Sequence, residues 1–213
     1  MKSTYIILIL ALLIGATNHT DGQSVKKADK RVTFYEYAVA VPILEKIIEK
    51  DGEGKEDAMI MLADCYRMMN EEQKATGLYA QIIEFDSIDP INHYYYGQAL
   101  RTLGKYEDAK EQFLTYSNLV PDDPRGALFA EYSEEIQLWI EKANENKVHH
   151  LESINSENSE FSPIIHGDGI VFSTDRDLKK YLNPTYDWTG KPYLNFFYAN
   201  ADSSAPKYNP TYF

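Results

Sequence analysis

Two adjacent stretches of the chain, residues 56–89 and 90–123, are each 34 residues long and carry similar side chains at the same offsets. The residues that carry the pattern are Leu62, Ala63, Tyr66, Ala75, Tyr79 and Ile82 in the first stretch and Tyr96, Gly97, Gly104, Tyr106, Ala109, Phe113 and Pro121 in the second. A repeat of this length is one supersecondary unit that buries its apolar face only against its neighbours. The spacing therefore predicts a stack of short helix pairs.

This pattern resembles the tetratricopeptide repeat, in which two helices are joined by a tight turn. The resemblance implies an all-α solenoid with a concave groove that binds a partner chain. Gly104 can adopt the positive φ that ends the first helix of its unit, and Asn70 tolerates the same conformation in the preceding unit. We therefore expect a helix on each side of both turns.

The helical pattern extends beyond these two units. Upstream, the second-helix pattern recurs with a shift of one residue at Tyr37, Ala40, Leu44 and Ile47. A degenerate unit is therefore predicted at about residues 24–55, with Pro42 kinking its second helix or lying in the first turn. Downstream, the amphipathic stretch 125–144 is interpreted as the helix that closes the stack. The repeat domain is predicted to cover residues 23–145.

The first 22 residues have the features of a secretory signal, with a basic start at Lys2, an apolar run at Tyr5–Ile14 and small or polar residues up to Gly22. Cleavage is expected after Gly22, and cleavage after Ala16 is the alternative. The apolar run is shorter than the roughly 20 residues of a transmembrane helix, so no transmembrane span is expected. The protein is predicted to be exported and periplasmic, with outer-membrane association as a further expectation.

The composition argues against several classes of function. The net charge of −12 and the sequence pI of about 4.8 disfavour nucleic-acid binding, which needs clustered Lys and Arg. The single cysteine, Cys65, is interpreted as a small buried hydrophobe. The sequence contains no G-x-S-x-G, H-E-x-x-H or G-x-x-x-x-G-K-[ST] motif, so no catalytic residue, metal ligand or cofactor is predicted.

After the closing helix the pattern changes to β-branched and aromatic runs separated by Gly, Asn, Pro and Ser. A linker at residues 146–160 is predicted to lead into a β-rich unit at residues 161–213. Within that unit His166–Gly169 forms a tight turn, Ile170–Ser173 a short buried strand, and Tyr193–Tyr198 the next strand.

The segment Phe161–Asp177 resembles the repeat of TolB-like β-propellers, in which F-S-P-D-G, an apolar strand and S-x-R-D recur in each blade. Here Ile164, Ile165 and His166 lengthen the approach to the turn. A propeller needs at least four blades of about 40–45 residues each. The resemblance therefore implies an incomplete β-propeller of roughly one blade, and the chain is expected to be the N-terminal fragment of a longer protein.

The order of signal, helical repeats, closing helix and propeller segment resembles the OmpA-family envelope proteins of Bacteroidetes-type bacteria, including the peptidoglycan-tethering component of the type IX secretion and gliding machinery. The resemblance implies an α + β multidomain protein that acts as a non-enzymatic interaction scaffold in a secretion, gliding or outer-membrane-to-peptidoglycan assembly. It implies peptidoglycan binding only through a C-terminal domain that lies outside these 213 residues.

In a tetratricopeptide stack the groove is lined by the first helix of each unit, which gives eight candidate partner-binding residues. They are Ile60, Asp64, Arg67, Met68, Tyr94, Gln98, Arg101 and Thr102. A mixture of arginine and aromatic side chains suits an extended peptide with an acidic or apolar element. Ordinary solvated or inter-helix ion pairs are the alternative interpretation of Arg67 and Arg101.

Two other functions stay open at this point. The chain can be the front of a propeller-capped peptidase of the prolyl-oligopeptidase kind, which requires a downstream hydrolase domain with a nucleophile elbow. It can also be a free-standing periplasmic adaptor whose β segment pairs with the sheet edge of another chain.

Overall fold

The computed structural model describes residues 24–50, 52, 54–143, 149–151, 154–177 and 184–200. The chain divides into two compact units, residues 1–144 and 145–213, and each is described by itself. The predicted signal at residues 1–22 lies outside the described residues, as does the end of the predicted β-rich unit. Within the described part of the chain, every helix is too short or too polar to cross a lipid bilayer.

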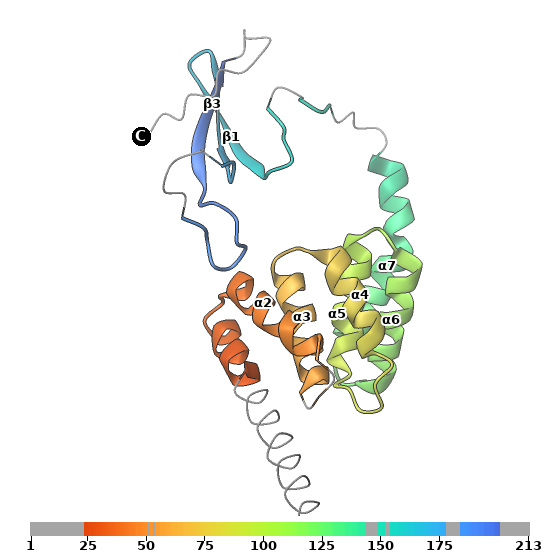
Figure 1. Cartoon of the computed structure of the whole chain (residues 1–213). Coiled ribbons are helices and arrows are strands. Elements are labelled where there is room, and N and C mark those ends of the chain that lie inside the picture. Colours follow the sequence, from red (N-terminus) through yellow and green to blue (C-terminus); the bar gives the residue numbers. More distant parts are fainter. Residues whose placement is uncertain are drawn as a thin grey trace, which may run out of the picture. The chain divides into compact units, whose positions relative to one another are not determined.

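The first unit is a stack of helices in which each helix packs against the next one along the chain (Figure 1). Residues 24–33 are helical. The helices that follow are α2 (Tyr37–Ile48), α3 (Lys55–Met68), α4 (Glu72–Ile82), α5 (Ile91–Thr102), α6 (Tyr106–Leu119) and α7 (Arg125–Ala143). The pairs α3–α4 and α5–α6 are the two 34-residue units, and α7 follows them. The predicted helical solenoid is therefore confirmed.

The turns and breaks lie at residues with the backbone freedom that they need. Asn70 between α3 and α4 has φ of 59°, and Gly104 between α5 and α6 has φ of 75°. Both residues tolerate this left-handed conformation, which reverses the chain after the first helix of a unit. Pro42 lies inside α2, beyond its first turn.

Small residues allow neighbouring helices to approach closely around α6. A Cβ atom on Gly97 of α5 would lie 2.7 Å from the ring of Phe113, which is fully buried in α6. A Cβ atom on Gly126 of α7 would lie 2.8 Å from the backbone nitrogen of Ser117. Because protein interiors are close-packed, neither position has room for a side chain. These two glycines therefore fix the distances of α5 and α7 from α6.

The second unit is an antiparallel sheet with the strand order β1-β2-β3. Its strands are β1 (Glu160–His166), β2 (Gly169–Thr174) and β3 (Asn195–Asn200), and its small core contains Phe172, Phe197 and Ala199. The hairpin turns where the sequence predicts, because His166 pairs with Gly169. The register shifts by one residue between Phe161 and Ile164, where Ser162 has φ of 54°, so a β-bulge lies there. The residues that lengthen the approach to the turn, 164–166, pair regularly with β2.

The third strand begins at Asn195 rather than at the predicted Tyr193. Asn195 pairs with Thr174, which is the last residue of β2, so the two residues before Asn195 have no partner on that strand. A propeller blade has four antiparallel strands, and the described residues form three. The propeller stays a prediction.

Candidate partner-binding surface

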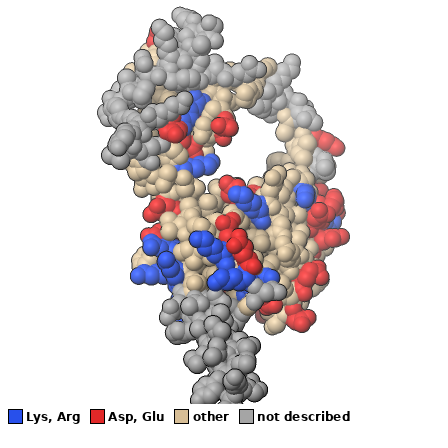
Figure 2. Space-filling view, viewed as in Figure 1, with Lys and Arg blue, Asp and Glu red and all other residues tan. Residues whose placement is uncertain are grey.

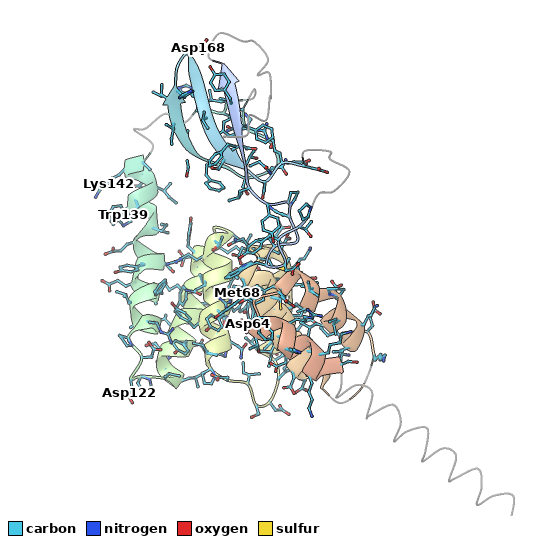
Figure 3. The ribbon with its side chains drawn as sticks, turned by 90° about the vertical axis from the view of Figure 1, so that its left-hand side faces the viewer. Asp64, Met68, Asp122, Trp139, Lys142 and Asp168 are labelled. Carbon is cyan, nitrogen blue, oxygen red and sulfur yellow. The ribbon has the colours of Figure 1, made fainter. Side chains whose placement is uncertain are left out.

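The helices α3 and α5 are the first helices of the two units, and α7 packs after α6 at the same interval, so residues 34 positions apart occupy equivalent places on the three helices. We call the set of candidate residues and their equivalents on α7 the first-helix surface. It consists of Ile60, Asp64, Arg67 and Met68 on α3, Tyr94, Gln98, Arg101 and Thr102 on α5, and Leu128, Tyr132, Glu135 and Ile136 on α7. Figure 3 labels Asp64 and Met68 on the first of these helices.

On α3, Arg67 is held by neighbouring side chains. Its Nη2 donates to Oδ1 of Asp64 at 3.1 Å, and its Nε donates to the Tyr79 hydroxyl at 3.3 Å. The Tyr79 hydroxyl in turn donates to the same Asp64 oxygen at 2.8 Å. The guanidinium carbon also lies 4.0 Å from the ring centroid of Tyr95 on α5. The charge of Arg67 is therefore compensated within the protein.

The pKa values agree with this closed network. Burial opposes the positive charge of Arg67, but the Tyr79 hydroxyl and the Asp64 carboxylate more than offset it, so the pKa of the guanidinium is raised. Burial is the main cause of the raised pKa of Tyr79, with the Asp64 carboxylate adding to it. Tyr79 therefore stays protonated and acts as a hydrogen-bond donor to Asp64.

On α5, Arg101 is in a different position. Its guanidinium carbon lies 4.6 Å from the ring centroid of Phe129 on α7, and the side chain is half-buried. No carboxylate of the described residues forms an ion pair with it. Thr102 next to it is exposed, and its hydroxyl donates to the backbone oxygen of Gln98 at 3.1 Å. Arg101 is thus oriented by an aromatic ring, and its charge is not paired with a carboxylate of the described residues.

Tyr94 differs from the other candidates because only 4% of it is exposed. Its ring lies 5.4 to 5.7 Å from the rings of Phe113, Tyr116 and Phe129, between α5, α6 and α7. The Nε2 atom of Gln98 donates to its hydroxyl at 3.0 Å. Tyr94 therefore supports the surface from the core, whereas Ile60, Asp64, Arg67, Met68, Gln98 and Arg101 are half-buried.

The α7 members of the surface were not among the predicted site residues, although adding 34 to each α5 candidate gives them directly. Leu128 is 40% exposed and Tyr132 is 49% exposed. The Tyr132 ring lies 6.1 Å from that of Phe129, beneath Arg101. Farther along α7, Trp139 is 64% exposed, and Figure 3 labels it near the end of the helix. The helix α7 therefore has an exposed apolar stripe.

Charge is distributed unevenly along the helical unit. Residues 24–50 contain six Lys or Arg and four Asp or Glu, whereas residues 105–143 contain four Lys or Arg and nine Asp or Glu. Figure 2 shows the acidic side chains of α6 and α7 gathered on one side of the stack. Arg101 is therefore a cation next to an acidic helix.

The β-rich unit contains a separate pocket of about 440 Å³. It is lined by Ser159, Phe161, Asp175, Tyr186, Thr189, Pro192, Tyr193 and Leu194. The Tyr186 ring lies 6.4 Å from that of Trp188 and 5.8 Å from that of Tyr193. Oδ1 of Asp175 accepts a hydrogen bond from the Ser159 backbone nitrogen at 2.8 Å, which places this carboxylate in a structural role.

The described residues offer little for metal or nucleophilic chemistry. Among them, no group of three or more His, Cys, Asp or Glu side chains is placed to hold a metal ion. Cys65 is buried in α3, and burial, with a smaller effect of the Asp64 carboxylate, raises the pKa of its thiol to about 12. A thiol with this pKa is protonated and unreactive at neutral pH.

Comparisons with known proteins show the fold. No family model and no curated protein sequence matches the chain. The structure is similar to that of the MamA protein, with 17% sequence identity and a TM-score of 0.53 over 62% of this chain and 72% of that chain. A second MamA structure gives 19% identity and a TM-score of 0.50, over 63% of this chain and 74% of that chain.

A weaker similarity joins the chain to PcrH in complex with the chaperone binding region of PopB, at 15% identity and a TM-score of 0.45 over 55% of this chain and 94% of that one. The C-terminal TPR-containing domain of a putative FK506-binding protein of Plasmodium falciparum gives 16% identity and a TM-score of 0.49, over 61% of this chain and 93% of that chain. The helical unit thus shares the helical-repeat fold of MamA, which agrees with the predicted tetratricopeptide-type stack.

Proposed function

We propose that the chain is a non-enzymatic protein-interaction scaffold whose first-helix surface binds an extended segment of a partner protein. The observation that carries this proposal is the continuity of the surface from helix to helix. Arg67 of α3 lies against Tyr95 of α5, and Arg101 of α5 lies against Phe129 of α7. Equivalent side chains therefore recur at regular intervals along one line, which suits a peptide better than a compact small molecule.

The chemistry of the surface supports the same proposal. It offers apolar contact at Ile60 and Leu128, hydrogen bonding at Gln98 and positive charge at Arg101. Such a mixture binds a chain that alternates apolar and polar side chains, and it includes no pair of groups that transfers a proton or attacks a substrate. The tetratricopeptide-type fold agrees with this role, because solenoids of stacked repeats present extended binding surfaces.

The test is a selection of binding peptides from a random display library with the full chain as bait. Peptides that bind are then measured against the parent chain, against the double variant Arg67→Glu and Arg101→Glu, and against Lys105→Glu. Lys105 is exposed, lines a pocket with residues of α4 and is not a member of the first-helix surface, so its variant controls for a general change of charge.

We expect the double variant to bind the selected peptides at least about tenfold more weakly, while Lys105→Glu binds them like the parent chain. Circular dichroism checks that each variant keeps its helical content. If the double variant binds as well as the parent, the site is wrong. If the library yields no binding peptide at all, the proposed function is wrong.

We also propose that the scaffold works in the cell envelope, exported and held in a periplasmic secretion or gliding assembly. Support comes from the signal-like sequence of residues 1–22 and from the order of the units along the chain. Its test is N-terminal sequencing of the tagged protein recovered from cell fractions. A periplasmic product that begins at Gln23 agrees with the proposal, and an uncleaved cytoplasmic product contradicts it.

The β-rich unit is proposed to be the first blade of a TolB-like propeller. Its strands follow one another in the order β1-β2-β3, as in a blade, and β1 pairs on one side only with β2 among the described residues. Hydrogen exchange on the 213-residue chain tests this. Backbone amides on the outer edge of β1 should exchange much faster than those of β2, and equally slow exchange in both strands would point to a complete sheet.

A further inference from the structure

Arg101 differs from the other arginines of the chain. The sequence has five arginines, and four of them pair with a carboxylate: Arg31 with Glu36, Arg67 with Asp64, Arg125 with Asp123 and Arg176 with Glu160. Among the described residues, Arg101 has no such partner. A guanidinium offers five N–H donors in a planar fork that fits a carboxylate, and a ring face satisfies none of them in full. Arg101 is therefore oriented to bind an anion from outside the chain.

An apolar surface lies directly beside this cation on the next helix. Phe129 stacks with Arg101, and Tyr132 contacts Phe129 one helical turn further along α7. Tyr132 and Leu128 are both close to half exposed. An apolar side chain placed against them would remove apolar surface from water on both partners.

The charges around α7 limit where a partner can carry negative charge. Glu131, Glu134 and Glu135 are all exposed on this helix, and only Glu134 among them has an ion-pair partner, Lys110 of α6. A carboxylate over α7 would meet repulsion from these residues. A partner with one acidic side chain therefore gains by placing it at Arg101 and by leaving uncharged residues over α7.

The distance between the two sites sets the spacing in the partner. Packed helices have axes about 8–10 Å apart, and an extended chain advances about 3.3 Å per residue. The side chains of α5 and α7 are in direct contact, so about three residues of extended chain separate the two sites.

We propose that the first-helix surface recognises a segment in which an aspartate or glutamate side chain binds Arg101 and a bulky apolar side chain about three residues away packs on Leu128 and Tyr132. This inference rests on the proposed function, because it names the kind of segment that the same surface binds. It assigns opposite preferences to two neighbouring helices: α5 selects a carboxylate, and α7 selects an apolar side chain.

The probes are two fluorescent synthetic peptides of about ten residues, blocked at both ends. One has a glutamate three residues before a Phe-Leu pair in a Gly-Ser background, and the other has glutamine in place of the glutamate. Binding to the full chain is measured by fluorescence anisotropy in low salt and again in high salt. The variants are Arg101→Gln, Tyr132→Ser and Lys105→Gln, the last as a charge-matched control outside the surface.

We expect the glutamate peptide to bind about tenfold more tightly than the glutamine peptide, and high salt to reduce this difference. Arg101→Gln should make the two affinities equal, whereas Tyr132→Ser should weaken both peptides and keep their ratio. Lys105→Gln should change neither. These patterns separate recognition of the acid from recognition of the apolar side chain.

Two results would overturn the inference. The first is an Arg101→Gln variant that still prefers the glutamate peptide by the same ratio, and the second is the absence of binding by either peptide. The proposed function fails separately, when a random library yields no binder. Library binders that lack an acidic residue near an apolar one would overturn the inference and leave the proposed function standing.

Discussion

Arg67 and Arg101 occupy equivalent positions in successive repeats, yet the protein treats their charges differently. Arg67 lies in the part of the helical unit formed by α3 and α4, which we call the closed half, and Asp64, Tyr79 and Tyr95 surround its guanidinium. Arg101 lies in the part formed by α5, α6 and α7, which we call the open half, and a single ring orients it. The same repeat position thus forms an internal ion pair in one unit and has no carboxylate partner among the described residues in the next.

The difference arises from two positions in each unit. Position 64 holds an aspartate, and the equivalent position 98 holds a glutamine, whose amide donates to Tyr94. Position 79 holds a tyrosine whose hydroxyl joins the network, and the equivalent position 113 holds a phenylalanine, which has no hydroxyl. Losing one carboxylate and one hydroxyl is sufficient to leave the second arginine uncompensated.

The largest effect is expected from Phe113→Ala, which empties the centre of the open half. Phe113 is fully buried and contacts Tyr94 and Phe129, so its truncation should cost about 3–5 kcal/mol of unfolding free energy. Urea denaturation followed by circular dichroism measures this loss. The adjacent residue Leu114 is 44% exposed, and Leu114→Ala should cost less than about 1 kcal/mol.

Which helices lose stability in Phe113→Ala tests whether the two halves unfold separately. Repeats in a solenoid contact only their neighbours, so hydrogen exchange in Phe113→Ala should speed up in α5, α6 and α7 and change much less in α2 and α3. Equal acceleration in all helices would show that the stack unfolds as one cooperative body, and the distinction between the halves would then have no energetic basis.

The second-largest effect is a loss of folding stability at high pH that depends on Cys65 in the closed half. Its pKa is raised by burial from the ordinary value of 9.0 to about 12, so the folded state keeps the thiol proton while the unfolded state loses it. The stability due to the neutral thiol is complete below pH 9 and falls as pH rises from 9 to about 12. At most, this contribution falls by about 1.4 kcal/mol per pH unit.

The measurement compares the parent chain with Cys65→Ala by urea denaturation at pH 8 and pH 10.5. Tyrosines and lysines titrate in both proteins, so only the difference between the two proteins reports on the thiol. That difference should shrink, or reverse in sign, at the higher pH. A difference that stays constant would show that the thiol ionises in the folded state, and that this part of α3 is open to water.

The sequence predicted the helical unit well because its information is local and periodic. Small residues at Ala63, Gly97 and Ala109 and large ones at Tyr79 and Phe113 mark where helices meet, and the structure buries all of them. The turns at Asn70 and Gly104 are also local, because each depends on the φ preference of one residue. The repeat period then extends a correct assignment from one unit to the next.

The candidate site was predictable only in part. Helical periodicity placed Tyr94 on the first-helix face, but it did not show that the large ring would be drawn between α5, α6 and α7 by Phe113 and Phe129. The state of each arginine depended on partners 3 to 28 residues away in sequence, and only the packed structure brings these together. The start of β3 likewise depended on where β2 ends, which is information from a different strand.

The third effect comes from removing a single hydroxyl, with Tyr79→Phe. The hydroxyl donates to Asp64 and accepts from Arg67, so its loss should cost about 1–2 kcal/mol of unfolding free energy. Tyr95→Phe is the matched control, because the structure gives the Tyr95 hydroxyl no hydrogen bond to a described residue, and it should be close to neutral. Equal stability losses in the two variants would mean that the network does not close this half.

The smallest effect is expected at Glu72, at the start of α4 in the closed half. Its Oε2 atom is buried and has no hydrogen-bond partner among the described residues, and burial raises the pKa of the carboxyl although Arg67 acts to lower it. Arg67 is already engaged by Asp64 and Tyr79, so it compensates this second carboxylate incompletely. Glu72→Gln should therefore stabilise the protein at pH 7, by less than about 1 kcal/mol because the residue is partly exposed to solvent.

The pH dependence of the stability difference between the parent chain and Glu72→Gln tests the sign of this effect. Because the folded-state pKa is raised above the ordinary value of 4.5, the unfolded state loses the Glu72 proton first as pH rises. The parent chain therefore loses stability relative to Glu72→Gln as pH increases from about 4 to 7, and the two should converge at the acidic end. If the two proteins were instead equally stable at neutral pH, Arg67 would already compensate the Glu72 carboxylate. In that case Arg67 would compensate the carboxylates of both Asp64 and Glu72 in the closed half. The contrast with Arg101, which has no carboxylate partner among the described residues, would then be larger.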